Sequence, residues 1–541
     1  MFPGNPVIAI AIAELFGSGK DSDCSIIFYV EERVPGGGEA SEEAESAPSM
    51  PADGAQGPNR KTRKVERNVG SPLPGHQHVL RYASERFRAK IDRWTGEQRD
   101  GGKKEPSLEL RVSLNSEDEE PAARAAIGLA YTGRVQAGSM REALEVRRQT
   151  AYLQVEGGVE ACDEFMRSRL HAASSDCSSS GDESGVEGGG TGQPLVLAFF
   201  SCTDLFPSPT EEPSFGVVLT WAKLALAHHF RDAPAVLNTR RLRTQLLALP
   251  AVAMEALLGS DAFGTDTEAS VLLLLATWMK ANFQNTDAPT RARLCRLVRL
   301  LPALATDFST GGRKGLPRAW FPIRFTEAAF IANLSSTSHL TSPTNRADAR
   351  VKLAAAGSDV YDLSSPWYNF AARPQCVDTT YKWSINEQEL EKVLEADAGG
   401  APGGQHVPVT FQGGSSSIAA QGLMWELRVL YGRGASTAGL LLTCNVPAAY
   451  KRAGARAAKK LAGVADLNVL LLLHWWQDGS REDRWSHSNT VTVVLGTGSL
   501  VGAIVLPPEA AGIDGMWSGY LHEGKISGSL MLMPPPPQSP L

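Results

Sequence analysis

The stretch GHQHVLRYASERFRAK, residues 75–90, places two histidines one residue apart in front of a run with helical spacing. Apolar and small side chains recur in it at intervals of three and four residues, which predicts one buried stripe on an amphipathic helix. The positions of this stripe are Leu80, Ala83, Ser84, Phe87 and Ile91. The two histidines could therefore either coordinate a metal ion or pack in the hydrophobic core behind this helix.

His76 and His78 are candidates for either role. Side chains at i and i+2 share a face on a strand, whereas on a helix they point about 200° apart. Zinc also needs further ligands close by, and the neighbouring sequence has no Cys or Asp at ligand spacing. We therefore predict no metal site, and we expect His76 to pack in the core.

Composition limits the class of protein. A chain of 541 residues is long enough for two to four domains, and 21% charged residues is ordinary for a soluble globular protein. A net charge of −6 argues against a dedicated nucleic-acid binder. The longest apolar runs, 7–16 and 467–476, are about half of what a bilayer requires, so no membrane partner is expected. Seven scattered cysteines without a C-x-x-C pair indicate a reduced intracellular protein.

Changes in composition divide the chain. Residues 35–74, 171–194 and 335–372 are rich in Gly, Ser, Pro or charge and are predicted to be a disordered insertion and two linkers, and 534–541 form a proline-rich tail. Between them we expect a mixed α and β domain (7–170), a helical domain (195–334) and an antiparallel β domain (373–533). The predicted fold class is multidomain α+β.

The first domain carries motifs of a known family. The pattern H-x-x-V-L-x-x-x-S-x-x-F, from His76 to Phe87, resembles the central helix of the BTB (POZ) fold. The other elements of that fold have counterparts in the same order: an apolar helix at 7–16, a strand at 22–30, a strand at 107–114, a helix ending in Y-T-G at 126–135 and a helix pair at 141–166. The resemblance covers about 150 residues and implies a BTB domain with a long insertion.

The later segments extend this resemblance. Residues 242–282, with L-P, S-D and T-E steps leading to Trp278, and 296–304 are similar to a BACK domain. The segments from 373 onward follow the order seen in plant-type BTB–BACK proteins of the light-response kind, whose β domain is sandwich-like and resembles the MATH/TRAF group.

The resemblance implies roles for individual residues. Three residues of the first helix are expected to form a homodimer interface: Ile8, Ile12 and Leu15. Three exposed neighbours of Phe87 would face a cullin: Arg88, Asp92 and Arg93. Six belong to the expected fold core: Asp23, His76, Leu80, Phe87, Tyr131 and Trp278. Many BTB domains place a basic residue after the histidine as a partner for the aspartate, but here that position is Gln77. An unpaired buried carboxylate is costly, so we expect Asp23 to be either more exposed or satisfied by another group.

The implied function is a non-enzymatic adaptor that dimerises, binds a cullin scaffold and recruits an unidentified protein for ubiquitination in the nucleus, the cytoplasm or both. The alternative is a dimeric scaffold or transcriptional co-regulator that binds no cullin, and co-purification of a cullin distinguishes the two. An enzyme is not expected. GSGKDS (17–22) lacks the first P-loop glycine, and GTGSLVG (496–502) precedes a strand where a dinucleotide site requires a helix. We predict no catalytic, cofactor or metal-binding residue.

One basic segment has two interpretations. Residues 60–67 contain five Lys or Arg side chains and lie after the acidic run EASEEAE. They would form a nuclear import signal if exposed, or they would balance the acidic run in a loop without structure.

Overall fold

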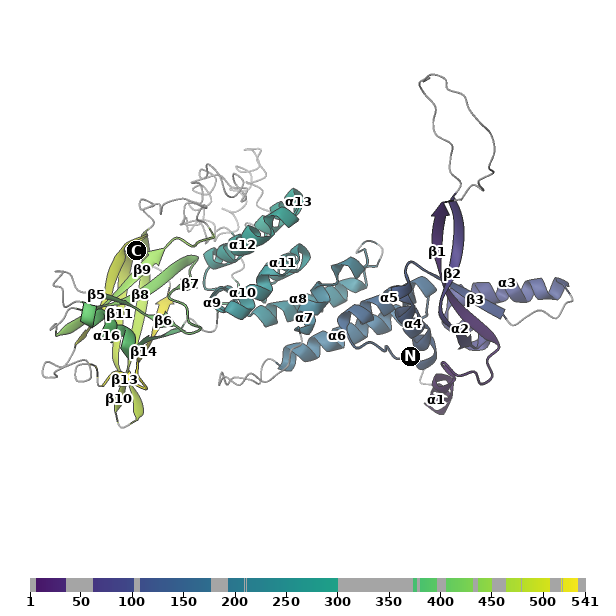
Figure 1. Ribbon diagram of the computed structural model, residues 1–541, viewed down its shortest axis with the longest axis horizontal. Coiled ribbons are helices and arrows are strands. Elements are labelled where there is room, and N and C mark those ends of the chain that lie inside the picture. The colour runs from purple at the N-terminus through teal and green to yellow at the C-terminus, as the bar shows by residue number, and fades with distance from the viewer. Residues whose placement is uncertain are drawn as a thin grey trace, which may run out of the picture. The chain divides into compact units, whose positions relative to one another are not determined.

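The computed structural model describes residues 6–35, 62–101, 108–176, 193–208, 210, 212–299, 373–376, 380–396, 405–431, 436–449, 464–477, 479–505, 517 and 519–533 (Figure 1). The chain divides into two compact units, Met1–Ala222 and Lys223–Leu541. Helices and strands occur in both, and nearly all strand pairs are antiparallel, so the fold is of the predicted α+β class.

The first unit is built on a three-stranded sheet. Helix α1 (Pro6–Leu15) leads to β1 (Cys24–Pro35), which pairs with β2 (Thr62–Gly75) in antiparallel and with β3 (Leu108–Leu114) in parallel orientation. Alternate side chains of β1 and β3 face one core, where Phe28 and Val112 are almost fully buried.

Strand β2 corrects the predicted insertion. We expected residues 35–74 to be disordered, but 62–75 form a strand along the whole length of β1 (Figure 1). Two of its basic residues form diagonal ion pairs with β1, with Lys64 2.8 Å from Glu31 and Arg67 3.1 Å from Glu32, and Leu73 enters the core. The alternation of the strand was hidden by its two prolines and its high charge. Residues 36–61 lie outside the described part.

The predicted central helix is two helices. Helix α2 (Gln77–Ala83) ends before Ser84, whose backbone is extended, and α3 (Glu85–Gly101) follows. The hydroxyl of Ser84 donates to the Leu153 carbonyl at 2.5 Å and accepts from the amide of Phe87 at 3.2 Å. It therefore caps α3, and the expected continuous stripe is interrupted at this residue.

The other helices of the first unit pack against the sheet and one another. In chain order they are η1 (Glu117–Glu119), α4 (Glu120–Thr132), α5 (Met140–Leu153), α6 (Gly158–Asp176), α7 (Leu195–Phe200), η2 (Thr203–Leu205) and the first part of α8 (Phe215–Phe230).

Two predicted boundaries in this part are wrong. The linker was placed at 171–194, but α6 continues to Asp176, and only 177–192 of it lie outside the described part. Helix α7, assigned from sequence to the helical domain, packs on α5 and α6 and belongs to the first unit. The guanidinium of Arg147 lies 2.6 Å from both Asp163 and Glu212, which ties α5 to α6 and to the segment before α8.

The second unit begins with a bundle of helices. These are the end of α8, α9 (Ala233–Asn238), α10 (Arg240–Leu247), α11 (Ala251–Leu258), α12 (Glu268–Asn282), η3 (Phe283–Asn285) and α13 (Ala288–Arg296). Helix α12 is the centre of the bundle, because it is apolar on nearly every side and ten of its residues are buried. Residues 300–372, where the predicted helical domain ends and its linker follows, lie outside the described part.

The rest of the second unit is β structure, as the sequence predicted. The elements are β4 (Thr380–Asn386), α16 (Glu387–Ala396), β5 (Gln405–Pro408), β6 (Thr410–Phe411), β7 (Ile418–Ala420), β8 (Leu423–Tyr431), β9 (Thr437–Asn445), β10 (Val464–Gln477), β11 (Ser480–Val494), β12 (Gly498–Val505), β13 (Leu521–His522) and β14 (Lys525–Met533). One sheet has the order β11-β10-β14-β4-β6 and the other β12-β9-β8-β5. Their inward faces share one apolar core around Trp425 and Trp517. The tail, 534–541, lies outside the described part.

Candidate interaction surfaces

His76 is a structural residue. It is fully buried, its Nε2 lies 2.9 Å from the carbonyl oxygen of Lys20, and its Nδ1 lies 3.3 Å from the hydroxyl of Tyr131. A carbonyl can only accept, so Nε2 carries the proton and Nδ1 accepts from the tyrosine. The same hydroxyl accepts from the amide of His76 at 3.0 Å, and burial raises the pKa of Tyr131 to about 12. His78, by contrast, points to solvent.

The apolar residues assigned to the core lie within it. Leu80, Phe87 and Tyr131 are buried in the first unit, and Trp278 is buried in the second, where its indole donates to the Leu249 carbonyl at 3.0 Å.

Asp23 was assigned to the core, with greater exposure as the alternative because Gln77 replaces the basic residue, and the structure shows the exposed arrangement. Asp23 is exposed, and its carboxylate accepts a hydrogen bond, 2.8 Å long, from the backbone amide of Gln77. Gln77 is the first residue of α2. With Gln77 in place of a basic residue, burial would leave the charge without a counter-ion, which is costly. At the surface it instead satisfies an amide at the start of a helix.

Helix α1 presents a different face from the expected one. Ile12 and Leu15 are half-buried and pack on the core of their own unit. Ile8 is 58% exposed, and on the same helix Val7 and Ile10 are also in solvent, at 69% and 59%. The face available to a second copy therefore consists of Val7, Ile8 and Ile10, and only one of the three predicted residues belongs to it.

The predicted cullin-facing residues are accessible. Arg88, Asp92 and Arg93 on α3 are all exposed. Asp92 lies 2.8 Å from Arg81 of α2, and Arg88 donates to the Arg81 carbonyl at 3.2 Å. This surface ion pair contributes little stability, because both side chains are about half exposed to solvent.

Arg88 also borders a groove that the sequence did not indicate. A cavity of about 570 Å³ lies where α3 and the turn between α5 and α6 meet, and three carboxylates, Glu85, Glu156 and Glu160, line it together with Arg88. The loop is held there by backbone bonds between Ala83 and Glu156 and between Glu85 and Gln154. The excess of negative charge favours a partner that presents a basic side chain.

The basic segment is partly structured. Residues 62–67 belong to β2, and within it Arg67 lies 3.1 Å from Glu32 and also contacts Glu117. Two of the five basic side chains, Lys64 and Arg67, are therefore paired, and an import receptor would have to compete with these ion pairs.

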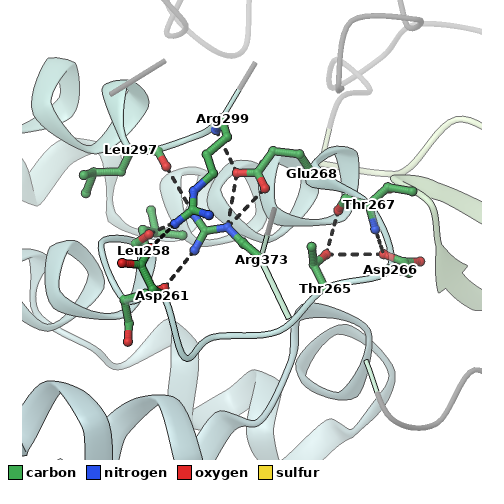
Figure 2. A network of polar contacts seen from close by, with 10 residues as sticks. Leu258, Asp261, Thr265, Asp266, Thr267, Glu268, Leu297, Arg299 and Arg373 are labelled. Atoms are coloured by element: carbon green, nitrogen blue, oxygen red, sulfur yellow. Dashed lines mark hydrogen bonds and ion pairs between the residues drawn. The ribbon is translucent and has the colours of Figure 1, made fainter. Parts of the chain in front are cut away.

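In the second unit, a buried ion pair ties the helices to the short segment 373–376, which precedes β4 in the chain (Figure 2). The side chain of Arg373 is fully buried and its Nε lies 3.1 Å from the carboxylate of Glu268, the first residue of α12. Its Nη atoms donate to three carbonyls at the ends of other helices: Leu258 at 2.8 Å, Ser260 at 3.1 Å and Leu297 at 3.2 Å. Arg299 adds a second cation, since its amide donates to Glu268 and its guanidinium contacts Asp261 (Figure 2).

A second set of polar contacts joins the helices to the β part itself. Asn238 exchanges two hydrogen bonds with the backbone of Ala419, at 2.8 and 2.7 Å. The amide of Gln421 donates to the buried carboxylate of Asp266 at 2.6 Å, and that of Gly422 donates to Ser270 at 3.0 Å. Gly422 has a φ of +75°, and a Cβ there would lie 2.5 Å from Ala269, so this turn requires glycine.

We had expected a β domain that folds separately behind a flexible break. That interpretation is wrong for the described residues, because polar side chains of the helices bind backbone groups of the β part. In the sequence, Glu268 belongs to the T-E step of the BACK-like segment, and nothing local connects it to Arg373, which lies 105 positions away.

Comparisons with known proteins provide no relative for this chain. No protein-family model matches it, and no curated protein matches it. In the part of the chain that the structure describes, no three His, Cys, Asp or Glu side chains lie together as a metal ion would require. Within the same residues, no helix combines the length and apolarity needed to cross a membrane.

Proposed function

We propose that this protein is a non-enzymatic, substrate-recruiting adaptor of a cullin-RING ubiquitin ligase. Its N-terminal unit would act as a BTB domain that dimerises and binds the cullin, its helices as a BACK-like spacer, and its β part as the substrate-binding end. The expected location is the nucleus, the cytoplasm or both. The observation that carries the proposal is the element order of the first unit: a short apolar helix, a strand, a broken helix, a parallel strand, and then α4 and the α5–α6 pair.

The accessible end of α3 supports a protein partner. Arg88, Asp92 and Arg93 lie in solvent beside the acid-lined groove, so one surface combines both signs of charge with a concave pocket. Charged groups of this kind select partners and raise association rates more than they add affinity. A scaffold that presents a basic side chain opposite Glu85, Glu156 and Glu160 would complement it.

The rigid link between helices and β part supports a spacer role. A substrate held by the sheets would keep a fixed position relative to the helices, because Asn238, Asp266 and Ser270 bind backbone groups of the β part. A fixed position is useful to a ligase, since ubiquitin transfer requires the substrate to be held near a second protein.

The test is capture of a cullin N-terminal domain by the full-length chain. Truncation before Arg373 would leave Glu268 as an unpaired buried charge and unfold the spacer, so point variants are required. Arg93→Glu and Asp92→Lys should each weaken cullin binding about tenfold, which is the loss in affinity expected when an interface residue that contributes to binding is replaced. Neither change should alter thermal stability.

Arg134→Glu is the matched control, because Arg134 is also exposed and its side chain has no ion-pair partner among the described residues. It should leave capture unchanged. A folded wild-type protein that fails to bind a panel of cullins at tens of micromolar would overturn the proposal, and a stable dimer in that case would favour the scaffold or co-regulator alternative.

A further inference from the structure

Lys90 lies in a cluster of three cations that is formed by α3 and the edge strand β3. Its half-buried ammonium donates a hydrogen bond to the backbone carbonyl of Arg111 on β3. On α3, side chains three or four positions apart are neighbours. None of the residues at these distances from Lys90 is acidic, and one of them is Arg86. We call Arg86, Lys90 and Arg111 the cation cluster.

The positive charge of the cation cluster is concentrated at the lysine. Burial and the charges of Arg86 and Arg111 lower the pKa of the Lys90 ammonium, and the exposed Glu109 of β3 is not among the groups that act on it. Glu66 of β2 lies 2.8 Å from Arg111 and pairs with that guanidinium. The uncharged amine therefore forms more readily at Lys90 than at a lysine in solvent.

Arg86 contributes a donor that has no acceptor. Its guanidinium lies 3.9 Å from the centre of the Tyr152 ring and donates to the hydroxyl of that residue at 2.7 Å. Its Nε–H is buried and has no hydrogen-bond partner among the described residues, although buried polar groups are nearly always paired. A negative charge at Lys90 would lie beside this guanidinium and give it a counter-ion.

The plainest role of Lys90 is to satisfy the carbonyl of Arg111. That role does not require an ammonium, because the N–H of an uncharged nitrogen also donates. The charged form is disfavoured here twice, since it is partly removed from water and has two like charges near it. A chemical change that makes this side chain negative would keep the hydrogen bond and remove both penalties.

We propose that Lys90 is a carboxylation site at which carbon dioxide forms a carbamate. The ammonium first releases a proton, and the lone pair of the neutral amine attacks the carbon of carbon dioxide. An N–C bond forms while one electron pair of a C=O bond moves onto oxygen. The nitrogen then loses a second proton to water, so the side chain changes from a cation to an anion.

The cation cluster suits the product of this reaction. A carbamate is a planar carboxylate, which is the group that guanidinium binds best, and Arg86 and Arg111 provide two guanidinium groups beside it. Its remaining N–H can donate to the carbonyl of Arg111 as the lysine does. This inference does not depend on the proposed adaptor function.

The experiment equilibrates the full-length chain with isotope-labelled bicarbonate at about pH 8, where an ordinary lysine with a pKa of about 10.4 is largely protonated. A trialkyloxonium reagent then traps carbamates as esters, and peptide mass spectrometry locates them. The label should be found at Lys90 and not at Lys20, an exposed lysine of the same unit. K90Q should lose this label and K20Q should keep it. Free α-amino groups are scored separately, because their ordinary pKa is about 7.7–8.0.

A second pair of variants tests the cation cluster. R86Q should reduce the label at Lys90 about two- to fivefold at a fixed pressure of carbon dioxide, which is the range of an exposed ion pair. R134Q is the matched control, since Arg134 is exposed in the same unit and its charge does not act on Lys90. If R86Q lowers the thermal midpoint, the K90Q and K20Q pair decides alone. No label at Lys90 in the folded protein, equal label at Lys20, or bicarbonate that binds without being trapped would overturn the proposal.

Discussion

The guanidinium of Arg373 lies 3.1 Å from the carboxylate of Glu268, with 0% and 4% of the two side chains exposed. Each charge lies at the favourable end of a helix. Glu268 is in the first turn of α12. Arg373 binds the carbonyl of Leu258, the last residue of α11, and that of Leu297, which directly follows α13. The helix macrodipole is positive at the N-terminus, where Glu268 lies, and negative at the C-terminus, where Arg373 binds. The pair therefore stabilises one N-terminal and two C-terminal helix ends together.

Removal of Arg373 should therefore be strongly destabilising. Arg373→Met leaves Glu268 as a buried charge without its cation and three carbonyls without donors, and we expect a loss of about 3–5 kcal/mol. Denaturant unfolding followed by tryptophan fluorescence measures it. Arg293→Met is the control, because Arg293 is half-exposed at 3.5 Å from Glu255, and its cost should stay below about 1 kcal/mol. The double variant Glu268→Leu/Arg373→Met should recover part of the loss; two additive costs would contradict a coupled pair.

Asp266 should make stability depend on pH. Burial raises the pKa of its carboxyl, so the folded protein holds this proton more tightly than the unfolded chain does. The corresponding stability is fully present below the unfolded value of about 3.9 and is lost as pH rises through the folded pKa. Compared with Asp266→Asn, the wild type should lose stability as pH rises from about 4 through the raised pKa of the folded protein. Denaturant midpoints at several pH values test this, with exposed Asp92→Asn as control. A constant difference would contradict the assignment.

Part of this architecture could be read from the sequence, because some patterns are local. The spacing of Leu80 and Phe87 identifies two core residues, and the position of His76 before them indicated a buried ring. The break at Ser84 could not be read in the same way, since the helical spacing continues across it. It depends on a hydrogen bond to Leu153, which is 69 positions away.

Features that depend on distant charges were missed for the same reason. Strand β2 resembles a charged loop in sequence, and only the fold brings Lys64 and Arg67 within ion-pair distance of Glu31 and Glu32. Likewise, Arg373 is an ordinary basic residue in sequence, and only the fold gives it Glu268 as a partner. Polar groups that bind across a boundary leave no periodic pattern, so sequence reasoning described the β part as independent of the helices.

Tyr131 should contribute to stability through its hydroxyl alone. Tyr131→Phe leaves the amide and Nδ1 of the buried His76 without their partner, which should cost about 1–3 kcal/mol. Tyr82→Phe is the control, since Tyr82 is 75% exposed and its change should be near neutral. Denaturant midpoints compare the two. Equal effects, or one zinc ion per chain that is lost in a His76→Ala variant, would mean that this histidine does not serve the core.

The exposed face of α1 should hold two copies of the chain together. Val7, Ile8 and Ile10 are too apolar to remain in water on a short helix, and a second copy with the same face can cover them. Light scattering should give twice the mass of one chain, and Ile8→Glu/Ile10→Glu should give a folded monomer, because these side chains make few contacts within their own unit.

Ile12→Glu provides the contrast that separates assembly from folding. Ile12 is half-buried against the core of the first unit, so a charge there should lower the thermal midpoint as well as affect association. The double variant at Ile8 and Ile10 should leave that midpoint near the value expected for the monomer. A wild type that is monomeric at micromolar concentration would show that the exposed face is not a dimer interface. If only Ile12→Glu dissociates the dimer, the interface depends on the side of α1 that packs on its own core.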